Sequence, residues 1–230
     1  MTIPTLILVC FAVKEEARFF KPIAAAQPHI ECVVTGMGRR NAERSIRAAL
    51  QRRQPTLVLT CGFAGGLRPE LAAGSIVYAL NGATDLEPAL RAAGAQPARF
   101  HCAARVAATA EEKRALRAAT GADAVEMESQ VICDICREHA IPSAIVRVVL
   151  DTANEDLPLD FNQLMTGDQQ LSSRKLALAL MKSPSKIGAL LRFQQQSEAA
   201  AKKLTEALKQ VVLSPRPIHP AASGPVRGFA

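Results

Sequence analysis

The residues best suited to chemistry gather in the stretch from Ala124 to Asp151, where two carboxylates precede an apolar helix and an arginine interrupts an apolar strand. Glu126 and Glu128 are separated by one residue, and the strand that ends at Asp151 carries Arg147. A charge inside a buried strand is costly unless it is paired, so we expect Arg147 to contact an acid or an anionic ligand. Ligands in open α/β sheets collect beyond the carboxyl ends of the strands, where Asp151 stands.

Arg147 and Asp151 also have a purely structural interpretation. The two side chains could form an ion pair with each other and have no part in binding or catalysis. Because structural ion pairs and functional sites both use such residues, the residue types favour neither interpretation.

Glu16 is a further candidate, close to the first predicted strand. It lies in the first turn of the following helix, where an acid is stabilised by the helix dipole. That structural reason is sufficient by itself. A catalytic base at the carboxyl end of a strand would occupy the same place.

Two glycine-rich segments follow predicted strands. In the first, Gly36 and Gly38 precede Arg39 and Arg40, an arrangement that lets backbone N–H groups and arginines approach an anion, although a lone GxG is a weak signal. In the second, three glycines within residues 62–66 indicate that the backbone passes very close to a ligand or to another segment.

The composition is that of an ordinary globular protein, with 230 residues, 49% hydrophobic and 21% charged residues, and a formal net charge of +7. With one Tyr and no Trp, platforms for base stacking are scarce, so we expect no nucleic-acid partner. Much of the excess positive charge lies in C-terminal helical segments, which we interpret as a solvated face that could contact an anionic membrane. These basic residues are Arg174, Lys175, Lys182, Lys186, Arg192, Lys202, Lys203 and Lys209.

The six cysteines lie mostly in apolar segments, which is typical of reduced cysteine in a cytoplasmic protein. Cys133 and Cys136 form a CxxC inside a predicted helix, and no second pair completes a zinc site, so we predict no metal. The apolar run at residues 6–13 reads as a first buried strand rather than a signal segment, and no run is long enough to span a membrane.

Predicted strands and helices alternate up to residue 151, which indicates an α/β domain with a mainly parallel sheet. We expect one domain over residues 1–212, helical from about Leu171 onward, and a disordered tail over 213–230. Residues 81–97 give no clear pattern and are interpreted as a loop or small excursion. The predicted strands are 5–12, 30–35, 57–61, 75–80, 98–103 and 144–150, with helices at 42–53 and 111–119 among others.

Five segments together resemble the nucleoside phosphorylase and nucleosidase family that includes methylthioadenosine/adenosylhomocysteine nucleosidase. They span residues 6–156 in the family's order: ILVCFAVKEEARFF, VVTGMGRRNAERS, LVLTCGFAGGL, AVEMES and PSAIVRVVLDTANED. The resemblance implies a three-layer α/β sandwich around a mixed, mainly parallel sheet, assembled as a homodimer or larger oligomer. It also implies cleavage of the N-glycosidic bond of a small-molecule purine nucleoside, without a metal or organic cofactor.

The resemblance assigns roles to matching residues at the base and the ribose. Asp151 matches the acid that protonates or hydrogen-bonds N7 of a departing purine, a general-acid contribution of about 10²- to 10⁴-fold. Glu128 matches the carboxylate that holds the ribose hydroxyls, with Met127 against the sugar and Glu126 as a further partner. Such contacts hold the ring while oxocarbenium-like charge develops.

The resemblance also assigns the nucleophile's surroundings. Glu16 matches the carboxylate that activates water in nucleosidases, and Arg147 matches the arginine beside the nucleophile. Gly62, Ala64 and Gly65 would bring the backbone close to the nucleoside.

Two positions depart from the family pattern. Phe63 stands where relatives commonly have Ser or Thr, and Leu150 stands where they commonly have Ser before the catalytic acid. The short middle segment and long basic C-terminal helices are more similar to a compact subgroup containing hopanoid-associated phosphorylases, which would release adenine from a lipid-linked adenosine. The more apolar site fits that alternative, and it also fits a non-catalytic nucleoside-binding protein.

The nucleophile is left open between water and phosphate. Phosphate as a co-substrate would need Arg39, Arg40 or Arg147, because the arginines that hold phosphate in phosphorylases have no clear match elsewhere. Glu16 favours water.

Overall fold

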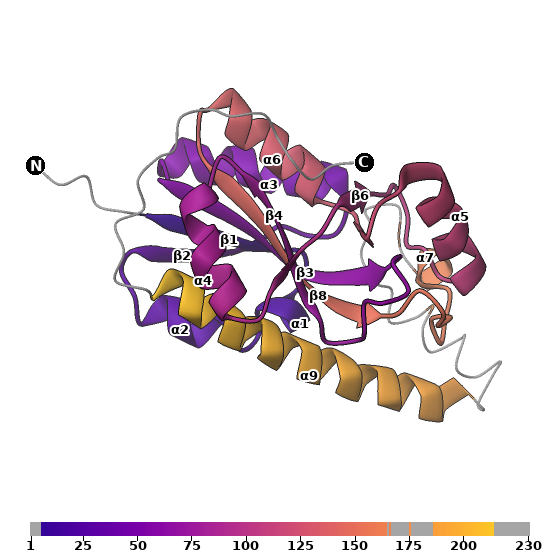
Figure 1. Ribbon diagram of the computed structural model, residues 1–230. Helices are drawn as coiled ribbons and strands as arrows, with labels where there is room; N and C mark the ends of the chain where they lie inside the picture. The colour runs from indigo at the N-terminus through magenta and orange to yellow at the C-terminus, as the bar shows by residue number, and fades with distance from the viewer. Residues whose placement is uncertain (1–5, 165, 167–174, 176–185, 214–230) are drawn as a thin grey trace, which may run out of the picture.

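The computed structural model describes residues 6–164, 166, 175 and 186–213, which build one mixed β-sheet with helices on both faces (Figure 1). Arg174, Lys182 and the predicted tail beyond Leu213 lie outside the described residues.

The eight-stranded sheet runs in the order β2-β1-β3-β8-β4-β5, and β7 joins the end of β3 to β6. Neighbours from β2 to β8 are parallel, and β4 runs antiparallel to β8. The prediction of a mixed, mainly parallel sheet is therefore confirmed. The strands are β1 (Ile7–Phe11), β2 (Ile30–Val34), β3 (Leu57–Gly66), β4 (Ile76–Asn81), β5 (Gln96–Pro97), β6 (Phe100–Cys102), β7 (Ala124–Glu126) and β8 (Ser143–Asp151).

Helices cover both faces of the sheet, which gives three layers. Helices α3 and α6 pack on one face, whereas α1, α2, α4 and α9 pack on the other (Figure 1). None of the helices within the described ranges is long and apolar enough to cross a membrane. The helices are α1 (Lys14–Ala17), α2 (Lys21–Ala25), α3 (Arg39–Arg52), η1 (Thr84–Leu86), α4 (Glu87–Ala92), α5 (Ala110–Thr120), α6 (Ser129–Glu138), α7 (Phe161–Leu164) and α9 (Ile187–Val212).

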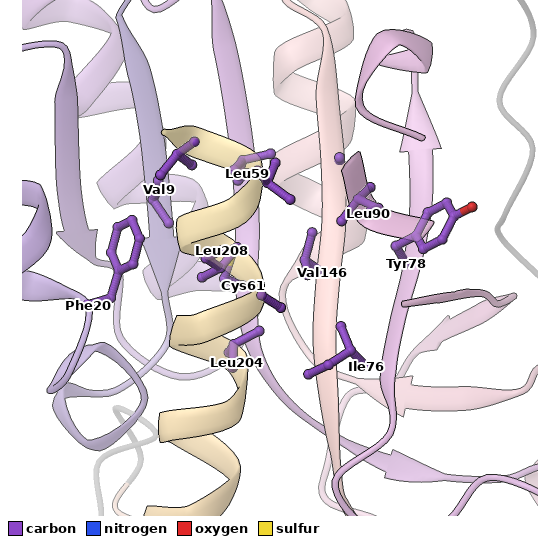
Figure 2. Close-up of a cluster of buried hydrophobic side chains, with 14 of the residues drawn as sticks. Val9, Phe20, Leu59, Cys61, Ile76, Tyr78, Leu90, Val146, Leu204 and Leu208 are labelled. Carbon is purple, nitrogen blue, oxygen red and sulfur yellow. The ribbon is translucent and has the colours of Figure 1, made fainter. Parts of the chain in front are cut away.

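The C-terminal half of α9 supplies much of the core on its face of the sheet. Figure 2 shows Leu204 and Leu208 pointing from α9 toward Leu59 and Val146 on β3 and β8. Full burial of a leucine side chain contributes about 1.5–3 kcal/mol, so this helix is a major stabiliser of the two central strands. Those strands hold the side chains described below.

The structure differs from the simplest sequence-based elements in two places. Strand β3 does not end at Cys61 but continues through the glycines to Gly66, because β8 and β7 supply hydrogen-bonding partners for that extension. Residues 81–97 are not a plain loop, since they contain η1 and α4, whose Leu90 enters the core.

Candidate active site

Arg147 forms the centre of a buried polar cluster on the sheet face covered by α6. Its side chain is 1% exposed. One guanidinium nitrogen, Nη1, donates to the Cys61 carbonyl at 2.6 Å. The other, Nη2, lies 2.7 Å from Glu126 Oε2 and 2.8 Å from Ser129 Oγ. The expectation that Arg147 meets an acid is confirmed, and the acid is Glu126.

Glu126 joins this arginine to the start of α6. Besides contacting Arg147, its Oε2 accepts hydrogen bonds from the backbone N–H groups of Glu128 at 3.0 Å and Ser129 at 2.7 Å. Carboxylates are stabilised where helix N–H groups lack intrahelical partners. The sequence placed Glu126 at the ribose; its contacts here are with Arg147 and the helix start.

Glu128 lies beside the same arginine and reaches the first glycine-rich loop. Its Oε1 accepts a hydrogen bond from the Gly38 N–H at 2.7 Å, and its Oε2 lies 3.9 Å from Arg147 Nη2. Burial and the nearby Glu126 carboxylate raise the pKa of Glu128 to about 7, against the opposing effect of Arg147. Glu128 can therefore change its charge near neutral pH.

Glu16 approaches the cluster from the carboxyl end of β1. Its Oε2 accepts from the N–H groups of Ala12 at 2.9 Å and Val13 at 3.1 Å, and its Oε1 accepts from the Phe63 N–H at 2.7 Å. Burial raises the pKa of Glu16, whereas the charge of Arg147 and these N–H groups oppose the rise.

Gly62 lies between Glu16 and Arg147. A Cβ at this position would stand 2.5 Å from both Glu16 Oε1 and Arg147 Nη1, and the backbone φ of +146° disfavours other residues. The structure thus brings together Glu16 and Arg147, the two residues that the sequence proposed for the nucleophile's surroundings. The backbone was expected to pass very close to a ligand or another segment here, and at Gly62 the close neighbours are the side chains of Glu16 and Arg147.

Asp151 lies four residues further along β8, about 13 Å from Arg147 at the usual rise per strand residue. Its Oδ2 forms an ion pair with Lys113 Nζ, so the alternative of an Arg147–Asp151 ion pair is wrong. A Cβ on Gly65 would lie 3.4 Å from the same oxygen, which makes this second glycine a neighbour of the acid. Burial raises the pKa of Asp151, and Lys113 opposes that rise.

Known proteins share this chain's fold and parts of its sequence. The family model described as Phosphorylase superfamily matches residues 98–182, the segment that holds Glu126, Glu128, Arg147 and Asp151. Over this segment the chain is similar to that superfamily.

Among its relatives in sequence, 5'-methylthioadenosine/S-adenosylhomocysteine nucleosidase of Shewanella piezotolerans is 25% identical over 188 residues, covering 66% of this chain and 81% of the relative. The enzyme of the same name from Anoxybacillus flavithermus is 26% identical over 165 residues, covering 57% and 71%.

Two solved structures show the likeness of fold over almost the whole chain. The nucleosidase of the same name from Neisseria meningitidis, in complex with methylthio-immucillin-A, has a TM-score of 0.68 at 17% identity and covers 92% of this chain and 100% of its own. Futalosine hydrolase of Helicobacter pylori has a TM-score of 0.65 at 13% identity, covering 90% and 98%. The predicted three-layer α/β sandwich around a mixed, mainly parallel sheet is confirmed.

Lys113 is a residue of this site that sequence reasoning missed. It lies on α5 with a fully buried side chain, and its ammonium also donates to the carbonyl oxygens of Thr152 at 2.8 Å and Glu155 at 2.7 Å. The charged residues around Lys113 are typical of a solvent-exposed helix. Only the packing of α5 against the loop after β8 reveals its place beside Asp151.

Phe63 and Leu150, the two departures from the family pattern, belong to the opposite face of the sheet. The partly buried Phe63 and the buried Leu150 pack against the core cluster that includes α9. Gln196 of α9 donates to the Leu150 carbonyl at 2.5 Å. Ala64 is buried in a separate apolar cluster, so its predicted substrate contact stays an expectation.

A cavity of about 450 Å³ opens next to Glu128, at the start of α3. Arg39, Arg40 and Met127, three of the residues singled out in the sequence, line this cavity. Gly36 and Gly38 precede it with φ values of +86° and +78°, which a turn of this kind requires.

The CxxC of α6 is not arranged for metal or redox chemistry. Cys133 and Cys136 are buried, and desolvation raises the pKa of Cys133 to about 12, so its sulfur stays a thiol. Within the described ranges, no group of three His, Cys, Asp or Glu residues could hold a metal ion.

Proposed function

We propose that this chain cleaves the N-glycosidic bond of a purine nucleoside, with adenine as the departing base. The observation that carries the proposal is that Glu16 and Glu128 both lie close to Arg147, with Asp151 further along the same strand as Arg147. The named activities of the relatives, which are nucleosidases, support the same reaction class.

In this proposal Asp151 acts at the base. A purine leaves readily only if N7 is protonated or hydrogen-bonded as the bond breaks, because the base then departs neutral. Burial raises the pKa of Asp151, which favours the protonated form that an acid needs, and the contact with Lys113 fixes the carboxyl group at the end of β8.

Glu128 acts at the sugar, with Met127 beside it. Its carboxylate holds the ribose hydroxyls, and its negative charge stabilises the oxocarbenium-like transition state. The hydrogen bond from Gly38 and the neighbouring Arg147 hold this side chain in place.

We propose water as the nucleophile and Glu16 as the base that activates it. Arg147 is surrounded by Glu16, Glu126 and Glu128, so its single positive charge is outnumbered. A phosphate dianion at this point would be repelled by the carboxylates, whereas neutral water is not. Glu16, whose pKa is raised by burial, is a better proton acceptor than an exposed glutamate.

The test is base release by the purified chain from adenosine, methylthioadenosine, adenosylhomocysteine and a lipophilic 5′-alkyl adenosine, each with and without phosphate. We expect adenine from at least one of them without phosphate, and we expect Asp151→Asn to lower turnover by at least about 10²-fold. Asp85→Asn, which changes an exposed acid, serves as the matched control. Full turnover by Asp151→Asn, or a strict need for phosphate, would contradict these roles.

The lipophilic substrate in this panel addresses the alternative of a lipid-linked adenosine. Ile187 and Leu191 on α9 are 46% and 56% exposed, and Lys186 and Arg192 lie beside them. This combination of apolar and basic side chains supports contact with an anionic membrane surface. Strong preference for the alkyl substrate and binding to anionic vesicles would support that assignment.

Two further proposals concern assembly and compartment. The family resemblance supports a homodimer, which sedimentation of the purified chain would test. All six cysteines are free, and four of them are buried, which supports a reducing cytoplasmic location.

A further inference from the structure

The cavity at the start of α3 has a strongly basic lining. Arg39, Arg40 and Arg44 line it together with the amide of Gln130, and no acidic residue is among the described residues that form its walls. Its volume of about 450 Å³ suits a small ligand group. Met127 and Val131 add an apolar wall.

None of these three arginines pairs with a carboxylate among the described residues, although Arg44 donates to Asn41 Oδ1 at 2.8 Å. Neither Arg39 nor Arg40 forms an ion pair within the described part of the chain. Elsewhere on α3, by contrast, Arg47 pairs with Glu43 and Glu138, and Arg52 pairs with Glu31. The unpaired charges are therefore confined to the cavity end of this helix.

Their position costs stability in the absence of an anion. Arg39 and Arg40 are the first two residues of α3, and the first turn contains no acidic residue. A helix N-terminus carries partial positive charge, so it repels cations in the first turn. An anion in the cavity would turn this repulsion into attraction.

The cavity adjoins the ribose end of the proposed site. Gly38, which donates to Glu128, directly precedes Arg39, and Met127, next to Glu128, lines the cavity. Asp151, which acts at the base, lies at the far end of the site along β8. A charged group here would therefore be attached to the sugar and point away from the base.

Resting on the proposed function for the placement of the nucleoside, we propose that this cavity binds a phosphate or carboxylate group carried on the ribose side of the substrate. The substrate class is thus an anionic purine nucleoside. A free phosphate nucleophile would instead need to lie beside Arg147 and Glu16, neither of which lines the cavity.

The test compares the binding of adenosine 5′-monophosphate, adenosine and inorganic phosphate by calorimetry. The variant Arg39→Gln/Arg40→Gln removes two of the unpaired charges that line the cavity, and Arg47→Gln/Arg52→Gln removes two charges from the same helix away from the cavity. In the wild type and in the control we expect the monophosphate to bind at least about tenfold more tightly than adenosine. In Arg39→Gln/Arg40→Gln we expect that preference to vanish while the affinity for adenosine stays within about twofold.

Three results would overturn the proposal. These are equal wild-type affinities for the monophosphate and adenosine, a preference that survives Arg39→Gln/Arg40→Gln, and inorganic phosphate binding as tightly as the monophosphate. Adenine release, measured in parallel, keeps the two proposals separable. Preferential binding without release contradicts only the catalytic function, whereas release without the preference contradicts only the anion cavity.

Discussion

Replacing Lys113 with Met tests how the proposed catalytic acid is controlled. Methionine keeps the length and apolar stem of lysine but removes the ammonium that contacts Asp151, Thr152 and Glu155. Because Lys113 is fully buried and Asp151 nearly so, water cannot replace the lost charge easily. Asp151 then becomes a buried carboxylate without a counter-ion.

The size of the effect depends on pH. Removing one partner of a buried ion pair costs about 3–5 kcal/mol when the other stays charged. Once Asp151 is protonated, only the two unpaired carbonyl groups remain as a cost, about 1–3 kcal/mol. We therefore expect the free energy of unfolding of Lys113→Met to lie about 3–5 kcal/mol below wild type at pH 8, and about 2 kcal/mol closer to it at pH 4.5.

The sign follows from the pKa of Asp151. Burial raises that pKa above its unfolded value, so the proton is held more tightly in the folded protein, and stability is lost as pH rises through the folded pKa. Removing Lys113 raises the pKa further, so this loss becomes larger and extends to higher pH. About 2 kcal/mol corresponds to more than one pH unit, since one unit is 1.36 kcal/mol.

The assays are urea denaturation followed by circular dichroism across this pH range, and the pH profile of kcat/KM for adenine release. In Lys113→Met we expect the alkaline limb of the profile to shift to higher pH by at least about one pH unit, because Asp151 keeps its proton to higher pH. Arg114→Met, at an exposed position of the same helix, is the matched control. An unchanged alkaline limb together with a constant stability difference at all pH values would refute the reasoning and leave Lys113 as a tether for the loop.

Two further substitutions test other contacts of the site. Gly62→Ala forces a methyl group against Glu16 and Arg147 at a φ of +146°, so we expect a loss of about 2–5 kcal/mol in unfolding free energy together with most of the activity. Gly94 also has a positive φ, +76°, but no atom lies within 4 Å of its Cβ position, so Gly94→Ala should lose only about 1–2 kcal/mol and keep full turnover. For Glu128, whose pKa is raised to about 7, wild-type kcat/KM should rise with pH through that value and stability should fall, because the folded protein holds the proton more tightly. Glu128→Gln should abolish this limb and lower kcat/KM by about 10- to 150-fold; a rise near pH 7 that persists in the variant would assign the titration to another group.

The sequence predicted part of the polar cluster because the evidence for it lies within one short segment. An arginine inside an apolar strand requires an acid, and Arg147 has Glu126. The alternation of strands and helices likewise predicted the layered sheet. The hydrophobic pattern of a strand does not show whether the strand runs parallel or antiparallel to its neighbour, however. The antiparallel pairing of β4 with β8 therefore could not be predicted from the sequence.

The Lys113–Asp151 ion pair could not be predicted from the sequence. The two residues are distant in sequence, and their contact depends on how α5 packs against the loop after β8. The solvent-exposed pattern around Lys113 predicts a surface lysine. The sequence-based ion pair between Arg147 and Asp151 was wrong for the same reason, because each side chain found a partner from another element.

The covering of β8 by α9 also has a consequence for how the chain is made. Ribosomes release the strand that ends at Asp151 well before they release the helix that ends at Val212, and at about 5–20 residues per second the interval is several seconds. During that time one apolar side of the central sheet, including Leu59 and Val146, lacks the leucines of α9. A nascent chain halted in this interval therefore exposes apolar surface of the kind that chaperones bind.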